Sequence, residues 1–229
     1  MNNTTKITFL LLAYLTLFSG VISAKTMLTA TVTTVTVGET ATVPATGFQQ
    51  LRFNTPQFGR YALHVHSDQG SALQLIDREN GPGEWHGSVG NNNGRLDTFL
   101  DAGDYKLQLQ SSERGSGTAN VHVQAFEELQ QDALQLVELK PENTTLADFQ
   151  QRSWWLELKE PRRIVIEAGG RHLQSLELWR GGRWRVPIAV ESRLITPEPG
   201  KPQKLLSFSV QLEAGQYRLS AYGGVGETW

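Results

Sequence analysis

Apolar and polar residues alternate along most of this chain of 229 residues. The clearest runs with an apolar side chain at every second position are Leu51/Phe53, Tyr61/Leu63/Val65, Leu73/Leu75, Tyr105/Leu107/Leu109, Val121/Val123, Trp154/Leu156/Leu158, Ile164/Ile166, Leu176/Leu178, Phe208/Val210/Leu212 and Tyr217/Leu219/Ala221. A period of two is typical of antiparallel strands with one buried face. Gly, Asn, Asp and Pro residues separate the runs, so the pattern predicts an all-β protein built from sandwiches or small barrels.

One segment, from Glu127 to Leu139, has a helical spacing of its apolar residues. It stands between two stretches rich in predicted strands. We therefore expect a connector followed by the first strand of a second module rather than an independent helix.

The chain contains an internal repeat. Leu100-Asp-Ala-Gly-Asp-Tyr-Lys-Leu107 matches Leu212-Glu-Ala-Gly-Gln-Tyr-Arg-Leu219, with five identical positions. In each copy a turn at Gly, which tolerates positive φ, leads into a strand that alternates Tyr and Leu. The repeat predicts two similar modules in tandem.

The repeat extends upstream with a different offset. Residues 37–77 align with 140–180 at a shift of 103, and the shift is 112 at the Ala-Gly turn. The second copy therefore holds nine more residues, which we place in the Pro-rich stretch 196–202 because loops accept insertions readily. The predicted modules are residues 25–126 (module one) and 127–222 (module two), with a Gly-rich linker or terminus at 223–229.

The first 24 residues predict a cleaved signal peptide. The apolar run Ile7 to Phe18 spans about 18 Å as a helix, which is too short for a bilayer core of about 30 Å. Val21-Ile22-Ser23-Ala24 resembles a small-residue cleavage site, so we expect a cut after Ala24. The mature chain would be periplasmic or extracellular, with no stable membrane insertion.

The strand and turn motifs resemble the bacterial pre-peptidase C-terminal domain family. The matching segments are Leu51-Arg52-Phe53, Leu73 to Asp77 and Leu100 to Leu109 in module one, and Trp154 to Leu156, Leu176 to Trp179 and Leu212 to Leu219 in module two. The resemblance implies two jelly-roll-like antiparallel β-sandwiches that serve as non-catalytic accessory domains. The layout of signal peptide, tandem sandwiches and Gly-rich exit also resembles the N-terminal region of bacterial alpha-2-macroglobulin-like envelope proteins.

Composition narrows the range of functions. Removal of residues 1–24 takes away one Lys and no acid, so the formal charge becomes 20 − 23 = −3, which favours no nucleic-acid partner. The chain has no Cys, so it can form neither disulfides nor Cys-based zinc sites. It contains no nucleophile elbow, no His-Glu-x-x-His motif and no phosphate-binding loop. We predict a protein that is not an enzyme and needs no cofactor.

Three histidines form a candidate metal site. His64 and His66 fall on one face of a predicted strand, and His122 lies between two inward-facing valines, so it too points outward. The alternative is ordinary polar positions on a half-buried sheet. Module two has Glu167 and Gly169 at the positions of His64 and His66, which favours that alternative.

Module two also carries a candidate binding face of aromatic and basic residues, namely Trp155, Trp179, Trp184, Arg180 and Arg183. Outward Trp beside Arg can stack on sugars or on peptides. Alternatively, the same residues pack against module one or against a downstream domain. The leading hypothesis is a non-catalytic binding or spacer region at the N-terminus of a larger secreted or envelope protein. Its partner would be a protein or carbohydrate of the cell envelope, or downstream domains of the same chain. The competing hypothesis is a periplasmic metal-binding protein.

Overall fold

A computed structural model describes residues 32–129 and 134–224, all within one compact unit that begins at Val32. The described residues form strands, turns and loops without a helix, which confirms the predicted all-β class. Accordingly, no helix among them could cross a membrane. The predicted signal peptide and its cleavage site lie outside the described residues.

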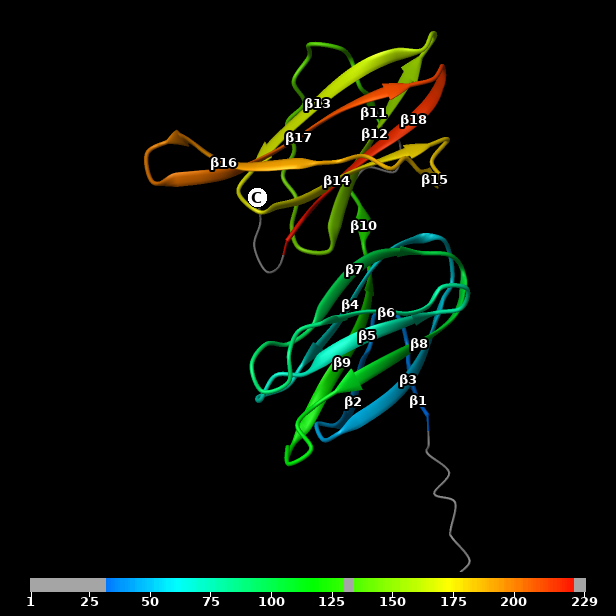
Figure 1. The fold of residues 1–229 in the computed structure, drawn as a ribbon, viewed down its shortest axis with the longest axis vertical. Helices are drawn as coiled ribbons and strands as arrows, with labels where there is room; N and C mark the ends of the chain where they lie inside the picture. The colour runs from blue at the N-terminus through cyan, green and yellow to red at the C-terminus, as the bar shows by residue number, and fades with distance from the viewer. Residues whose placement is uncertain (1–31, 130–133, 225–229) are drawn as a thin grey trace, which may run out of the picture. The chain divides into compact units, whose positions relative to one another are not determined.

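Module one is a sandwich of two sheets (Figure 1). The first sheet has the order β1 (Thr33–Val35), β3 (Phe48–Thr55), β8 (Gly103–Gln110), β5 (Ala72–Asp77) and β6 (Gly81–His86). The second has the order β2 (Thr40–Pro44), β9 (Thr118–Ala125), β4 (Gly59–His66) and β7 (Arg95–Leu100).

Module two repeats the first of these sheets. Its order is β10 (Glu127–Glu128), β12 (Gln150–Leu158), β18 (Gly215–Gly223), β14 (Leu173–Arg180) and β15 (Trp184–Arg185), with β11 (Leu134–Gln135) also paired to β12. The second sheet has the order β13 (Arg162–Gly170), β17 (Lys201–Leu212) and β16 (Glu191–Glu198). In both modules the first strand is parallel to its neighbour, since β1 runs parallel to β3 and β10 and β11 run parallel to β12.

Each module has its own hydrophobic core between its two sheets. Leu51, Tyr61 and Leu107 are among the buried residues of the first core, and Trp154, Ile166 and Phe208 are among those of the second. Nearly all residues of the period-two runs are buried in these cores, whereas Leu156 and Val210 are half-buried against the second one. Burial of these alternate side chains is the main force that holds each pair of sheets together.

The Ala-Gly turn has the same geometry in both copies. Gly103 and Gly215 have φ values of 142° and 148°, a region that a residue with a Cβ rarely adopts. The hydroxyl of Tyr105 donates a hydrogen bond to the Asp101 carbonyl at 3.1 Å, and Tyr217 donates to the Glu213 carbonyl at 2.9 Å. The repeated acidic-Ala-Gly-x-Tyr motif is therefore a turn closed by its own tyrosine.

The nine extra residues of module two lengthen a hairpin rather than a loop. β16 ends at Glu198 and β17 begins at Lys201, so the Pro-rich stretch forms the tip and adjoining strand ends of a long hairpin. The expectation of a loop at 196–202 was wrong, because only Pro199 and Gly200 of this stretch lie outside the two strands. β16 is an edge strand that pairs only with β17 among the described strands, so the hairpin can be longer without disturbing the core.

Candidate functional site

The two modules differ at the position of β9, the strand that comes after the one carrying the Ala-Gly-x-Tyr motif. In module one, β4 lies between β7 and β9. Its counterpart in module two, β13, pairs with β17 on one edge and with no described strand on the other. The second sheet of module two is therefore open where β9 closes module one.

The residues that correspond to β2 are nevertheless present, in a segment that forms no strand. The shift of 103 places residues 143–147 on the positions of β2, Thr40–Pro44. Val43 in β2 is 4% exposed and Leu146 at the equivalent position is 0% exposed, so both turn inward. In module one β9 lies between β2 and β4 and pairs with both. In module two no described strand lies between the equivalent segments, residues 143–147 and β13.

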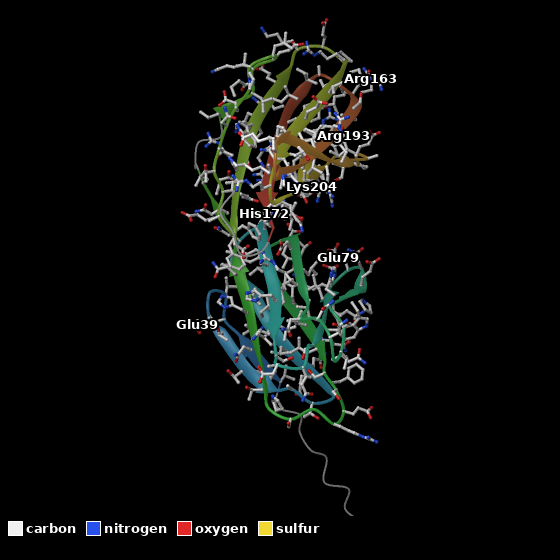
Figure 2. All side chains as sticks on the ribbon, turned by 90° about the vertical axis from the view of Figure 1, so that its left-hand side faces the viewer. Glu39, Glu79, Arg163, His172, Arg193 and Lys204 are labelled. Carbon is white, nitrogen blue, oxygen red and sulfur yellow. The ribbon has the colours of Figure 1, made fainter. Side chains whose placement is uncertain are left out.

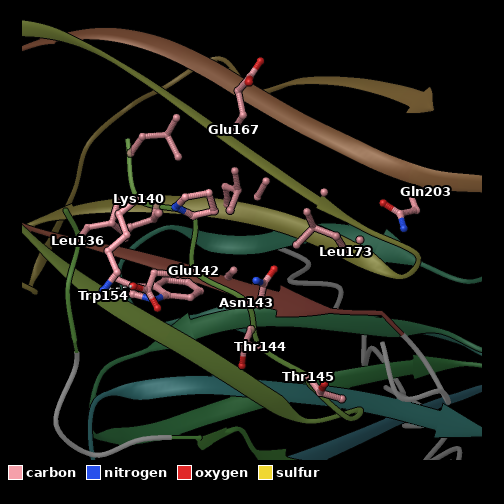
Figure 3. Close-up of a pocket in the computed structure, with 18 of the residues that line it drawn as sticks. Leu136, Lys140, Glu142, Asn143, Thr144, Thr145, Trp154, Glu167, Leu173 and Gln203 are labelled. Carbon is pink, nitrogen blue, oxygen red and sulfur yellow. Dashed lines mark ion pairs between the residues drawn. The ribbon is translucent and has the colours of Figure 1, made fainter. Parts of the chain in front are cut away.

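A cavity of about 640 Å³ occupies this position. One wall is the segment that includes Asn143, Thr144 and Thr145, and the facing wall is β13 from Ile166 to Gly170. Figure 3 shows Glu167 on the β13 side and Asn143 and Thr144 on the other, with Leu173 between them and Trp154 beside Glu142. The remaining apolar lining comes from inward-facing residues of the first sheet, Leu176, Leu219 and Ala221.

One polar atom in the cavity lining has no partner. Trp154 is 7% exposed, and its indole Nε1 forms no hydrogen bond with any described residue. An indole N–H that is buried in this way usually finds an acceptor, because the unpaired donor costs about 1–3 kcal/mol. An occupant with a carbonyl group could satisfy it.

The repeat indicates which backbone groups of β13 face the open edge. In β4, the Val65 N–H bonds the Gly94 carbonyl on the β7 side, whereas the Arg60 carbonyl accepts from the Phe126 N–H on the β9 side. Even-numbered residues of β4 therefore face β9. At a shift of 103 their counterparts are Arg163, Val165, Glu167 and Gly169, whose backbone groups face the cavity edge.

The outer face of the first sheet of module two is covered by module one. Arg60, in β4, is 1% exposed and reaches across to β14, where its Nη2 lies 2.7 Å from Glu177 Oε2. Its Nε donates to Gln151 Oε1 at 3.0 Å, and its guanidinium lies 3.6 Å from the ring centroid of Tyr222. A buried guanidinium with charged, polar and aromatic partners joins the modules.

A second ionic contact joins the modules nearby. Arg95, in β7, forms a bidentate pair with Asp148 at 2.9 and 2.7 Å and donates to Asp97 at 2.9 Å. Its guanidinium also lies over the ring of Phe149 at 4.7 Å. Asp148 and Phe149 precede β12, so the end of the segment that lines the cavity is held against module one.

The candidate metal histidines lie beside this contact. His64 and His122 are cross-strand partners whose rings stack with centroids 5.1 Å apart, and Phe149 stacks on His64 at 5.8 Å. His66 Nδ1 instead lies 3.1 Å from the Asn93 side-chain amide. The structure thus brings together two of the three histidines, and the described residues contain no group of three or more potential ligands arranged around a metal.

Burial and the neighbouring His122 and Arg95 lower the pKa of His64 to about 4 from its usual 6.5. A lowered folded-state pKa means that the unfolded chain takes up this proton more readily than the folded one. We expect stability to fall as the pH decreases from 6.5 to 4, by about 2 kcal/mol after allowance for partial solvent screening. Urea unfolding of wild type and His64→Phe should show the difference, with the variant lacking this part of the pH dependence; equal profiles would contradict the assignment.

The aromatic and basic residues of module two do not form one open face. Trp179 is 5% exposed and packs against Phe99 and Phe58 of module one, with ring centroids at 4.4 and 6.0 Å. Its assignment to an exposed binding face was therefore wrong, and the alternative of packing against module one holds for it. Trp184 is 77% exposed, Trp155 is half-buried, and Arg180 and Arg183 are exposed. These four keep the accessibility that binding would need.

Charged side chains elsewhere are spread over the surface. Figure 2 labels Glu39 and Glu79 in module one and Arg163 and Arg193 in module two, each pointing outward from a different strand or turn.

The cavity of module two is the candidate site, and sequence reasoning missed it. The repeat offers a signal, because β13 corresponds to β4 and yet has a described strand on only one of its edges.

No protein-family model matches the sequence, and neither does any curated protein. Among solved structures, the pre-peptidase C-terminal domain of a collagenase from Bacillus anthracis is similar at 17% identity and a TM-score of 0.33, over 40% of this chain and 93% of that one. A cycloisomaltooligosaccharide glucanotransferase from Paenibacillus sp. is similar at 8% identity and a TM-score of 0.25, over 76% of this chain and 40% of that one. The resemblance to alpha-2-macroglobulin-like proteins finds no support among these matches. Neither structural similarity carries an argument about function.

Proposed function

We propose that this chain is an exported, non-catalytic pair of β-sandwich modules that binds a partner at the cell envelope, as the N-terminal region of a larger protein. The observation that carries the proposal is the cavity of module two. Its lining combines aliphatic side chains and Trp154 with polar and charged groups, among them Thr144, Lys140 and Glu142. Its volume of about 640 Å³ lies within the usual range of ligand sites.

The junction supports the spacer part of the proposal. Inter-domain contacts within a chain are commonly loose, so relative motion is the usual expectation. Here a buried arginine, a bidentate ion pair and aromatic contacts around Trp179 connect the two sandwiches. Module one would thereby hold module two, and its cavity, in a fixed position relative to module one.

Binding is tested by co-sedimentation of the purified mature chain, residues 25–229, with isolated cell envelopes. Ala168 and Val165 are near neighbours on β13, but Ala168 lines the cavity whereas Val165 is 66% exposed on the outer face. We expect Ala168→Trp to fill the cavity and lower the bound fraction at least fivefold, while Val165→Trp leaves it unchanged. Equal binding by both variants would refute the cavity as the site.

Export is tested separately by N-terminal sequencing of the protein recovered from periplasmic and extracellular fractions. The proposal requires a mature protein that begins at Lys25. Recovery only in the cytoplasm, with the sequence starting at Met1 or Asn2, would refute it.

A further inference from the structure

We propose that the outer face of the first sheet of module one binds a neutral polysaccharide. The residues that carry the proposal are Phe48, Gln50, Trp85, Gln108 and Gln110, which together we call the aromatic–amide face. This face lies in module one and does not include the cavity of module two. The inference therefore goes beyond the proposed function, and either can fail without the other.

Two exposed aromatic residues meet on this face. Phe48, the first residue of β3, is 66% exposed, and Trp85, near the end of β6, is 39% exposed. Although β8 and β5 lie between their strands (Figure 1), the two rings approach edge to face with centroids 6.4 Å apart. Ala72 and Gln74 of β5 face outward, on the side opposite the core residue Leu73, and yet are only 4% and 8% exposed. The rings thus form one continuous apolar surface over the middle of the sheet.

Side-chain amides lie next to the ring pair. Gln50 and Gln108 are cross-strand partners on β3 and β8, and Gln110 stands opposite Phe48. Their positions in the alternation of each strand place all three glutamines on the outer face, where they are half-buried or exposed. None of the three side chains forms a hydrogen bond with another described residue. Their amide carbonyl and NH₂ groups are therefore available to a ligand beside the rings.

This combination of groups fits a neutral sugar. A pyranose has apolar C–H groups on the faces of its ring and hydroxyls around its edge. The negative face of an aromatic ring attracts C–H groups, and stacking removes apolar surface from water. Each sugar hydroxyl donates and accepts a hydrogen bond, and each glutamine amide can do both. Aromatic rings bordered by amides thus supply both kinds of contact without a charged group.

The equivalent face of module two shows what docking of a protein module requires. Module one covers that face, and there Arg60 pairs with Glu177 at 2.7 Å. The shift of 103 places Gln74 at the position of Glu177. Gln74 is uncharged, and its Nε2 already donates to the Gly83 carbonyl at 2.7 Å. A sandwich that docked in the same way would bury its arginine without a carboxylate, which is costly, so the aromatic–amide face suits an uncharged occupant.

The nearest charges define the main alternative. Arg52 and Lys106 are cross-strand partners in the next outward row of β3 and β8. Two cations beside the face would attract an anionic polysaccharide. The pair of Gln50 and Gln108 separates these cations from Phe48, so we assign the neutral class, and an anionic polysaccharide is one arm of the test.

Affinity electrophoresis of the mature chain, residues 25–229, tests the proposal. Native gels contain dextran, laminarin or galactomannan as neutral polysaccharides, or alginate as an anionic one, and mobility is compared with that in a gel without polysaccharide. We expect at least one neutral polysaccharide to retard the chain. Phe48→Ala and Trp85→Ala should each raise the apparent Kd about tenfold, because each removes a stacking surface. Leu194→Ala, which truncates a 79% exposed side chain of module two, is the control and should bind as wild type does.

Gln108→Leu separates sugar recognition from a general apolar contact. The substitution keeps a side chain of similar size but removes the amide. Binding of a neutral polysaccharide should weaken about threefold, because one hydrogen-bonding group is lost. An apolar protein surface would instead bind this variant equally well or more tightly. Far-UV circular dichroism confirms that each variant is folded.

Four results would overturn the proposal. Absence of retardation by all three neutral polysaccharides, or retardation by alginate alone, would exclude the neutral class. Undiminished binding by Phe48→Ala and Trp85→Ala would place the site elsewhere on the chain. Equal or tighter binding by Gln108→Leu would show that the amides do not recognise the ligand. A dimer in sedimentation equilibrium that Trp85→Ala abolishes would assign the face to a second copy of the chain.

Discussion

Replacement of Arg60 with methionine is expected to lower the free energy of unfolding by about 3–5 kcal/mol. The substitution keeps an apolar side chain of similar length but leaves Glu177 at the junction without its cation, 2.7 Å from where Nη2 stood. Gln151 also loses its 3.0 Å donor, and the ring of Tyr222 loses the guanidinium above it. An unpaired carboxylate under module one is the main cost. Urea unfolding at neutral pH measures the change.

The repeat provides a matched control for this substitution. Arg163 occupies the position of Arg60 in module two, but it is exposed and donates to Ser209 at the surface. Arg163→Met should change stability by less than about 0.5 kcal/mol. The double variant Arg60→Met/Glu177→Met should recover most of the loss, because an apolar pair can replace a buried ion pair at little cost. If the double variant is as unstable as Arg60→Met alone, the unpaired Glu177 carboxylate is not the cause of the lost stability.

Truncation of Trp179 to alanine is expected to cost about 3–5 kcal/mol, as for other buried aromatic residues. The ring packs edge-on against Phe99 and Phe58, so its removal opens a void at the junction of the modules. Trp179→Phe should lose less than half as much stability as Trp179→Ala, since it keeps an aromatic contact. Thermal and urea unfolding give both values.

Trp184 is the control for that truncation. It lies five residues further along the chain and is 77% exposed on the short strand β15. Trp184→Ala should change stability by less than about 0.5 kcal/mol. Similar losses from the two truncations would contradict the burial of Trp179 against module one.

The sequence predicted the parts of the fold that have a local pattern. Alternation of apolar residues located the strands, and the Ala-Gly-x-Tyr motif located a turn whose glycine φ and tyrosine hydrogen bond recur in both copies. These features depend on neighbouring residues and leave a local signature. Strand geometry likewise predicted that His64 and His122 share one face of the sheet, where they are cross-strand partners.

The junction between the modules could not be predicted in the same way. Arg60 and Arg163 occupy equivalent positions of the repeat, yet one is buried and the other exposed. The two arginines differ in burial because module two covers Arg60 and nothing described covers Arg163. The period-two pattern of a strand carries no information about such contacts between modules. Trp179 was ambiguous for the same reason, since an outward-facing aromatic residue serves a ligand or a neighbouring module equally well.

The candidate site was not predicted because it depends on how the strands are arranged in space. Most segments that line the cavity have counterparts in module one, but no described strand of module two corresponds to β9. A search for motifs finds residues that are present. The open edge of β13 becomes visible only when the described strands of the two copies are compared in space.

Residue-resolved amide hydrogen exchange tests most directly whether module two has an open edge at the cavity. Ala62, His64 and His66 of β4 pair with β9, and their counterparts Val165, Glu167 and Gly169 of β13 face the open edge. We expect the amides of Val165, Glu167 and Gly169 to exchange on the order of a hundredfold faster than those of Ala62, His64 and His66 in the free mature chain. Equal protection of the two sets would show that β13 is already paired and that module two has no open edge at the cavity.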